Sequence, residues 1–127
     1  MSKTKSTQGS HLEAFLYRAP KKNRDAVAQN LKKFVPWFEK HGVGIAYYRL
    51  GDSRTMEGME DVATTISATK DEDIWMEIQY FRDRKHSDEV YKEMMKDKEL
   101  EALATEFFSL VTQGKSLIAG SFDRLEE

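Results

Sequence analysis

Two carboxylates, Glu13 and Glu77, lie inside strand-like segments that we expect to be neighbours in a sheet. Carboxylates on one sheet face can share a proton, and sharing raises one pKa into the range used for acid–base catalysis. In the structural alternative each forms an ion pair with Lys115, Arg49 or a second subunit, or is solvated. The catalytic interpretation requires both carboxyl groups to point to the same face.

Aromatic side chains gather in the same strands. Trp75, Tyr47 and Tyr48, together with Phe15 and Tyr17, have the residue types that line a flat hydrophobic cavity. Aromatic residues are also enriched in interfaces, so a dimer core is the competing interpretation. The candidate pocket on the sheet face consists of Glu13, Phe15, Tyr48, Trp75 and Glu77.

The other reactive residue types indicate neither a cofactor nor a metal. The three histidines are not spaced as metal ligands, and the chain has no cysteine. The glycines form neither a phosphate-binding loop nor the tight elbow of serine hydrolases. We therefore expect no bound cofactor, no metal ion and no nucleophilic serine.

The strand pattern centres on residues 71–82, DEDIWMEIQYFR. Aromatic and branched residues from Ile74 to Phe81 predict a central strand. A strand upstream ends at Pro20, which cannot donate to a sheet ladder. The remaining predicted strands span residues 11–19, 43–50 and 115–125, with a short additional strand at 63–69.

Helical periodicity separates these strands. Apolar residues at spacings of four, three and four from Val27 to Phe38 predict a helix over residues 22–40. Asn23 is a candidate cap for this helix, and Pro36 predicts a kink in its last turns.

The second half repeats this order. Ser87 or Asp88 is expected to cap a helix that breaks near residues 96–98 and then continues. The resulting order, βαββαβ, predicts an α+β ferredoxin-like sandwich, with an antiparallel sheet and helices on one face.

The other sheet face is left open in such a fold. We expect Phe15, Tyr17, Trp75 or Tyr48 to form a large apolar patch there, and such patches normally mark interfaces. The sequence thus predicts a two-fold homodimer in which two sheets face each other, as in a dimeric α+β barrel.

Composition limits the partners. The chain of 127 residues fits a disordered tail over residues 1–10 and a single ferredoxin-like domain over residues 11–127. A net charge of -2 provides no basic stripe for nucleic acid. No apolar run approaches the ~20 residues that cross a bilayer, and the N-terminus lacks a signal-peptide core. We expect a cytoplasmic protein without nucleic-acid or membrane partners.

Six short motifs occur in a fixed order. They are H-L-E-A-F from His11, F-E-K-H-G from Phe38, Gly51-Asp52, Asp71-Glu72, Met95-Lys96-Asp97, and G-K-S-L-I-A-G-S-F from Gly114. Together, over about residues 11–125, they resemble the YbaA-like family of small bacterial and archaeal proteins of unknown function. The resemblance implies the dimeric α+β barrel fold and no established activity. The chain departs from the family at Ile78, where members often carry Trp.

Two functions from different classes are compatible with these features. The residues slightly favour an uncharacterised interaction protein whose sheet face serves only dimerisation. The alternative is a small-molecule-binding protein or a cofactor-free enzyme, oxygenase-like or isomerase-like, with a cavity around Glu13 and Glu77. A fully packed inter-sheet space would exclude the alternative.

Overall fold

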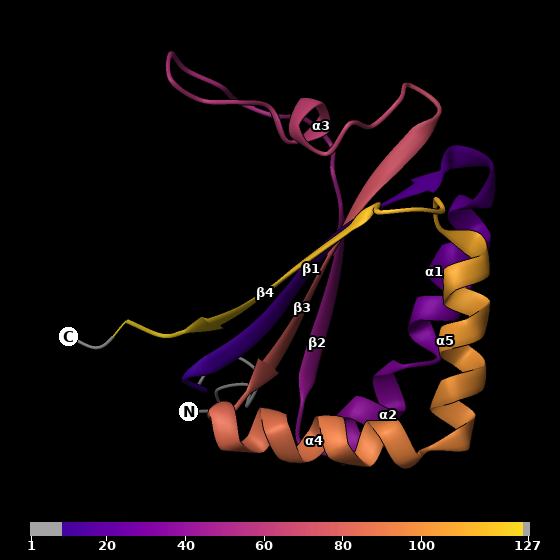
Figure 1. Cartoon of the computed structure of the whole chain (residues 1–127), viewed down its shortest axis with the longest axis vertical. Helices are drawn as coiled ribbons and strands as arrows, with labels where there is room; N and C mark the ends of the chain where they lie inside the picture. Colours follow the sequence, from indigo (N-terminus) through magenta and orange to yellow (C-terminus); the bar gives the residue numbers. More distant parts are fainter. Residues whose placement is uncertain (1–8, 126–127) are drawn as a thin grey trace, which may run out of the picture.

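The computed structural model describes residues 9–125, so the predicted tail lies almost entirely outside the described residues. Four strands form one antiparallel sheet in the order β2-β3-β1-β4 (Figure 1). This is the predicted ferredoxin-like order, and it makes β1 and β3 neighbours. The strands are β1 (His11–Pro20), β2 (Gly44–Arg49), β3 (Glu72–Phe81) and β4 (Leu117–Asp123).

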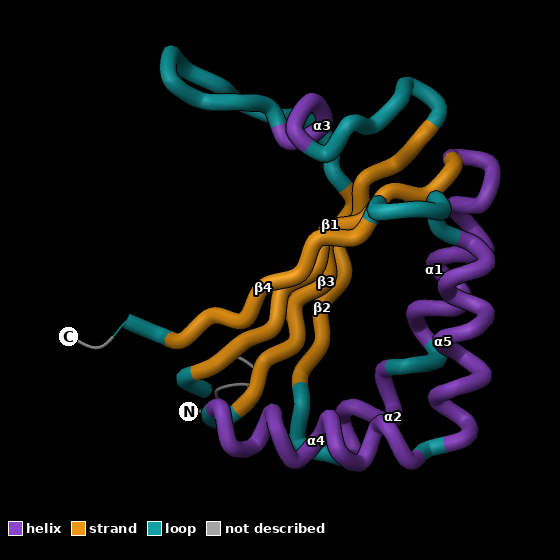
Figure 2. The backbone as a smooth tube through the Cα atoms, in the orientation of Figure 1, coloured by secondary structure: helices purple, strands orange, loops and turns teal. Residues whose placement is uncertain are grey.

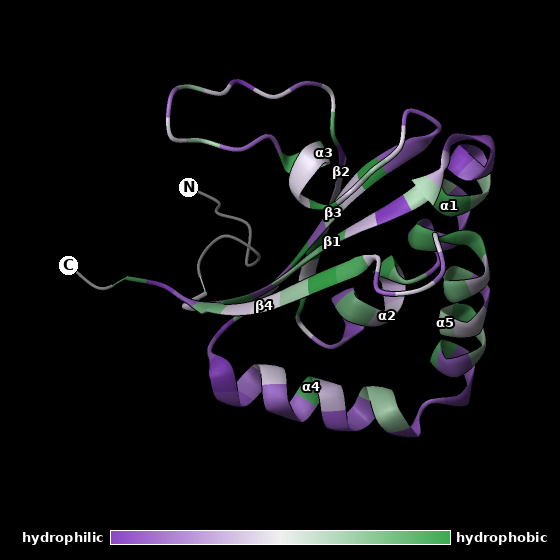
Figure 3. Ribbon diagram, turned by 45° about the horizontal axis from the view of Figure 1, so that its top comes forward, coloured by the Kyte–Doolittle hydropathy of each residue, from purple (hydrophilic) through white to green (hydrophobic). Residues whose placement is uncertain are grey.

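Helices cover one face of this sheet (Figure 2). The crossover from β1 to β2 consists of a 3-10 turn, η2 (Lys21–Asn23), followed by α1 (Arg24–Lys32) and α2 (Val35–Lys40). The crossover from β3 to β4 consists of α4 (Arg84–Lys96) and α5 (Lys98–Leu110). α5 lies beside α1 and is more apolar than α4 (Figure 3).

The helix predicted over residues 22–40 is interrupted at Lys33 and Phe34. Pro36 lies in the first turn of α2, where its missing N–H costs nothing. In a continuous helix its ring would clash with the carbonyl of Lys32, so the chain breaks before it. Asn23 precedes α1, but its side chain does not cap the helix. Its Nδ2 donates to the carbonyl of Leu110 at 2.9 Å.

The start of α4 differs from the prediction. Asp83 is the cap, and its carboxylate accepts a hydrogen bond from the backbone N–H of His86 at 2.8 Å. Ser87 and Asp88, the predicted caps, therefore lie within the helix. An aspartate three residues before a buried first-turn residue satisfies a free backbone donor there.

The predicted break between the last two helices is confirmed at Asp97. This residue ends α4 and caps α5, accepting from the backbone N–H of Leu100 at 3.0 Å. Its carboxylate also accepts from Trp37 Nε1 at 2.9 Å. The joint between α4 and α5 is therefore tied to α2.

The strand predicted at residues 63–69 is wrong. Residues 62–65 form a short helix, α3 (Val62–Thr65), in a segment that projects away from the sheet (Figure 1). Within residues 9–125 this segment pairs with no strand, and its backbone bonds close locally, including Thr65 N–H to the carbonyl of Asp61 at 3.0 Å.

The placement of the aromatic residues also differs from the prediction. Side chains alternate between faces along a strand. Tyr17 and Trp75 are only 1 % and 5 % exposed, because they pack beneath the helices, and Phe15 shares their face. Of the four predicted residues only Tyr48 lies on the open face, where it is 53 % exposed. The open face is apolar nonetheless, because it carries Leu12, Leu16, Met76, Ile118 and Phe122.

Candidate functional site

A cavity of about 560 Å³ lies between the helix-covered face of the sheet and the two crossovers. Exposed Met95 and Phe108 lie among its lining residues, from α4 and α5. Its lining is mostly aromatic and aliphatic. The aromatic rings are those of Phe15, Tyr17, Phe34, Phe38, Tyr91, Phe107 and Phe108.

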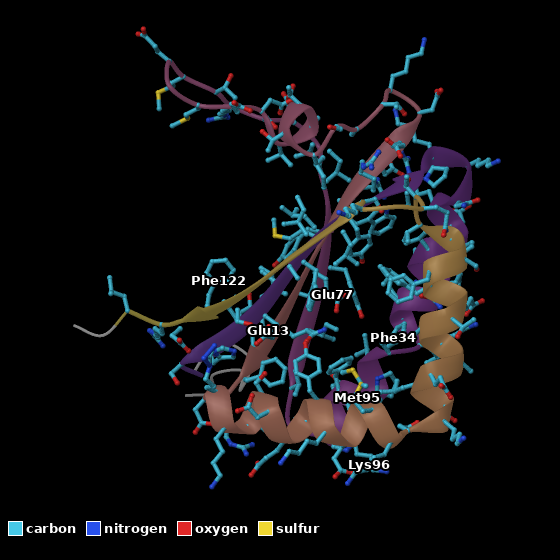
Figure 4. All side chains as sticks on the ribbon, viewed as in Figure 1. Glu13, Phe34, Glu77, Met95, Lys96 and Phe122 are labelled. Carbon is cyan, nitrogen blue, oxygen red and sulfur yellow. The ribbon has the colours of Figure 1, made fainter. Side chains whose placement is uncertain are left out.

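Glu77 is the central polar group of this cavity (Figure 4). It lies on β3 between Phe15 of β1 and Tyr47 of β2 in the strand register. Gln79 Nε2 donates to Glu77 Oε2 at 2.6 Å, and the Tyr91 hydroxyl donates to Gln79 Oε1 at 2.5 Å. These two bonds fix the orientation of the amide and hold one carboxylate oxygen. Within residues 9–125, nothing donates to the other oxygen, Oε1.

The apolar surroundings change the acidity of this carboxyl group. Burial raises the pKa of Glu77 to about 7, although the hydrogen bond from Gln79 acts in the opposite direction. A carboxyl group with this pKa accepts and returns a proton readily near neutral pH. Facing groups from three other elements, Tyr17, Tyr47 and Tyr91, have pKa values raised by burial first and then by charge, so they stay protonated.

Some buried polar atoms on the sheet face that carries Glu77 have no partner among the residues that the structure describes. They are the hydroxyls of Tyr17 and Tyr47 and the indole Nε1 of Trp75. The charge of Glu77 contributes to the raised pKa of both tyrosines, which places these hydroxyls in the electrostatic field of the carboxylate.

Glu13 belongs to a separate network. His11 donates from Nε2 to Glu13 Oε2 at 2.6 Å and from Nδ1 to Asp123 Oδ1 at 2.7 Å. Ser121 Oγ donates to Glu13 Oε1 at 2.6 Å, and Ser87 Oγ lies 3.3 Å from Oε2. Burial disfavours a charged His11, but the hydrogen bonds to Asp123 and Glu13 outweigh it and raise the pKa. The structural interpretation fits Glu13, with His11 as its cationic partner.

The five sequence-predicted site residues are thus only partly brought together. Glu13 and Glu77 point to the same face, as the catalytic interpretation requires (Figure 4), but within residues 9–125 no hydrogen bond joins them. Phe15 and Glu77 line the cavity, whereas Trp75 lies in the adjoining core. Tyr48 lies on the opposite face. This cavity is on the helix-covered face, whereas a cavity between two facing sheets stays a prediction.

Sequence reasoning missed two residues of the site, Gln79 and Tyr91. Gln79 follows Glu77 by two positions on one strand, and that spacing alone places both on one face. Tyr91 gave no such signal, because its position depends on how α4 crosses the sheet.

The described residues were also searched for a metal-ligand group and for a helix that could cross a membrane. None of their histidine, aspartate and glutamate side chains gather in a group of three suited to a metal ion. Within residues 9–125, no helix has the length and apolar character that crossing a membrane requires.

Comparison with known proteins identifies a family and a related fold. A family model described as a protein of unknown function (DUF1428) matches residues 10–109. The crystal structure of a mutant of SnoaB, a cofactor-independent oxygenase from Streptomyces nogalater, aligns with a TM-score of 0.53 at 9 % identity, over 94 % of this chain and 97 % of that chain. No curated protein matches the sequence. At this identity the likeness shows the fold alone, and it confirms the predicted α+β class.

Proposed function

The chain belongs to the DUF1428 family of unknown function, and we propose that it binds a small, largely apolar molecule and transfers a proton to or from it through Glu77. One observation carries this proposal: the carboxyl group of Glu77 faces an apolar cavity, with one oxygen held by Gln79 and the other free. The YbaA-like motifs supply no activity, so the proposal rests on this geometry.

The chemistry begins with ionised Glu77 as a base. Its free oxygen takes a proton from a weakly acidic O–H or C–H group of the ligand, and the bonding electron pair stays on the ligand. Return of the proton to a different atom is isomerisation, whereas reaction of the ligand anion with dioxygen is oxygenation. The cofactor-independent oxygenase SnoaB, which shares the fold, supports chemistry that needs only protein side chains.

Exchange of deuterium from solvent into ligand C–H groups tests this function directly. A collection of small apolar ketones in D2O is followed by proton NMR with wild-type protein, Glu77→Gln and Glu101→Gln. Glu101 lines the same cavity from α5 but is exposed, so it is a matched control.

We expect wild type and Glu101→Gln to catalyse exchange and Glu77→Gln to be inactive. The rate should rise as pH increases through about 7, because only the ionised carboxylate is a base. Equal exchange by wild type and Glu77→Gln for every ketone would remove the carboxylate from the mechanism.

A second proposal concerns assembly. The open face carries a strip of exposed apolar side chains, and we propose that a second copy of the chain covers it. Tyr48, Ile118 and Phe122 are 53 %, 47 % and 55 % exposed there. Residues 12, 14 and 16 of β1 and 118, 120 and 122 of β4, which face outward, include no charged side chain. A surface of this kind can pair with itself about a two-fold axis.

Two phenylalanines of matched exposure test the dimer. Phe122, 55 % exposed, lies on the open face, and Phe108, 56 % exposed, lies on α5. Native mass spectrometry should give a dimer for wild type and Phe108→Asp and a monomer for Phe122→Asp, because the new charge would be buried unpaired. A Phe122→Asp dimer would place the interface elsewhere. Substitutions at Phe15 or Trp75, which the sequence placed on the open face, would instead damage the cavity and the core.

A further inference from the structure

Glu77 has no cationic partner among residues 9–125, where its only side-chain contact is the hydrogen bond from Gln79 at 2.6 Å. Buried charges are normally paired, because an isolated one loses its hydration without compensation. Three other largely buried carboxyl groups of the sheet follow this rule: Glu72 pairs with Arg18 at 3.2 Å, Asp73 with Arg24 at 2.7 Å, and Glu13 with His11 at 2.6 Å.

The walls of the cavity supply no cation to Glu77 either. The lining residues among 9–125 include no lysine, arginine or histidine. Arg49, which the sequence suggested as a partner, instead lies over Trp75, with its guanidinium carbon 5.8 Å from the ring centroid. The titratable groups that face Glu77 or line the same cavity are neutral or acidic: Tyr17 and Glu13 on β1, Tyr47 on β2, Tyr91 on α4 and Glu101 on α5.

The rest of the lining is compatible with a positively charged group on an apolar body. Phe15, Phe34 and Phe107 contribute aromatic rings to the cavity, and the faces of such rings attract cations. An anionic ligand would instead meet the like charge of ionised Glu77. A neutral ligand would leave that charge without a counter-ion.

We propose that the cavity is a binding site for a small apolar amine, held as its ammonium ion by the free oxygen of Glu77. Glu77 lines the cavity and is only partly buried, so an N–H group can reach it. The carboxylate already lost hydration when the protein folded, and binding therefore dehydrates only the ammonium group.

This inference goes beyond the proposed function, although both require that the cavity takes ligands. Glu77 here pairs with a cation instead of exchanging a proton with a neutral ligand. A bound amine would occupy the base and stop proton transfer to or from any other molecule.

Three probes that share one apolar chain separate the charge site from the cavity. They are 4-phenylbutylamine, 4-phenylbutan-1-ol and 5-phenylpentanoate, which end at about pH 8 in an ammonium group, a hydroxyl group and a carboxylate. Calorimetric titration of each probe is made with wild type, Glu77→Gln and Glu101→Gln. The alcohol reports the apolar cavity, whereas the difference between amine and alcohol reports the ion pair.

We expect wild type to bind the amine about tenfold to a hundredfold more tightly than the alcohol, because a hydrogen bond between charged groups is gained. The carboxylate should bind more weakly than the alcohol. In Glu77→Gln the amine should lose its advantage, while the alcohol affinity should stay within about twofold because its contacts are mostly apolar. Glu101→Gln, at an exposed position, should match wild type.

Proton release gives a second readout that needs only wild type. At about pH 6 most Glu77 carboxyl groups are protonated, because burial raises the pKa to about 7. The ammonium ion favours the ionised carboxylate, so binding should release about one proton into the buffer. Titration in two buffers with different ionisation enthalpies counts this proton, and Glu77→Gln should release none.

The results that overturn the amine site differ from those that overturn the proposed function. Equal affinity of wild type for amine and alcohol, an amine preference that persists in Glu77→Gln, or amine binding without proton release would overturn the amine site. Binding of the alcohol in any of these cases would leave the proposed apolar ligand site in place. Failure of wild type to bind any of the three probes would overturn both.

Discussion

Replacing Glu77 with glutamine should remove a large step from the pH dependence of folding stability. Burial raises the pKa of this carboxyl group from 4.5 to about 7. That difference corresponds to about 3 kcal/mol of unfolding free energy. The folded state binds the proton more tightly than the unfolded state, so the stabilising effect of protonation is complete below about 4.5. Stability is then lost as the pH rises to about 7.

Urea unfolding, followed by circular dichroism at pH values below and above this window, measures the effect. His11 also has a raised pKa and loses stabilisation as the pH rises, but it is present in both proteins. The difference between Glu77→Gln and wild type therefore isolates Glu77, and it should change by about 3 kcal/mol in favour of the variant. Glu101→Gln, at an exposed position on the same cavity, should follow wild type. Parallel curves for Glu77→Gln and wild type would show that this carboxyl group is as well hydrated as a surface one.

Three other substitutions give distinct results. Arg24→Gln should destabilise the protein at neutral pH and progressively less in acid. Arg24 lowers the pKa of Asp73, so the stabilisation from this pair disappears as the pH falls below 3.8. Equal destabilisation at all pH values would contradict a role for the Asp73 charge. Asp97→Ala removes the 2.9 Å hydrogen bond between Trp37 Nε1 and the Asp97 carboxylate. The urea midpoint of unfolding should fall, and the fluorescence emission of Trp37 should shift to longer wavelength. Unchanged emission would mean that the bond is absent in solution. Phe81 is 1 % exposed and lies outside the cavity lining. Phe81→Ala should lower the free energy of unfolding in urea by about 3–5 kcal/mol, while a small apolar ligand still binds in the cavity. A smaller loss of stability would indicate a loosely packed core.

Local chemistry in the sequence was sufficient for the main elements. The strand expected at Ile74 to Phe81 corresponds to β3, and the break expected at residues 96–98 is the joint at Asp97. Predictions failed where structure depends on distant neighbours. The β-branched segment at residues 63–69 pairs with no strand in the described part of the chain, so intrinsic preference alone did not make it a strand.

The candidate site was predictable only in part, for a related reason. Period-two alternation groups the residues of each strand into two faces, but only the strand register shows that Glu13 and Glu77 share one of them. The alternation also does not show which face the helices cover. Apolar residues such as Leu12 and Leu16 occupy the other face of β1, so both faces look buried in the sequence. The choice is made by the amphipathic helices, and contacts such as that between Tyr91 and Gln79 appear only after that packing.

The cavity is lined by two kinds of element, strands of the sheet on one side and helices that meet at Asp97 on the other. Glu77, the group proposed for chemistry, lies in the sheet ladder, whereas part of the opposite wall consists of α4 and α5, which are connected through one residue. Rotation of α4 about this residue would alter the size of the cavity without breaking a strand–strand hydrogen bond. Substitutions in α4 or α5 can therefore change which molecule fits while the reactive groups keep their positions. A family built on this plan could diversify its ligands while retaining one type of reaction.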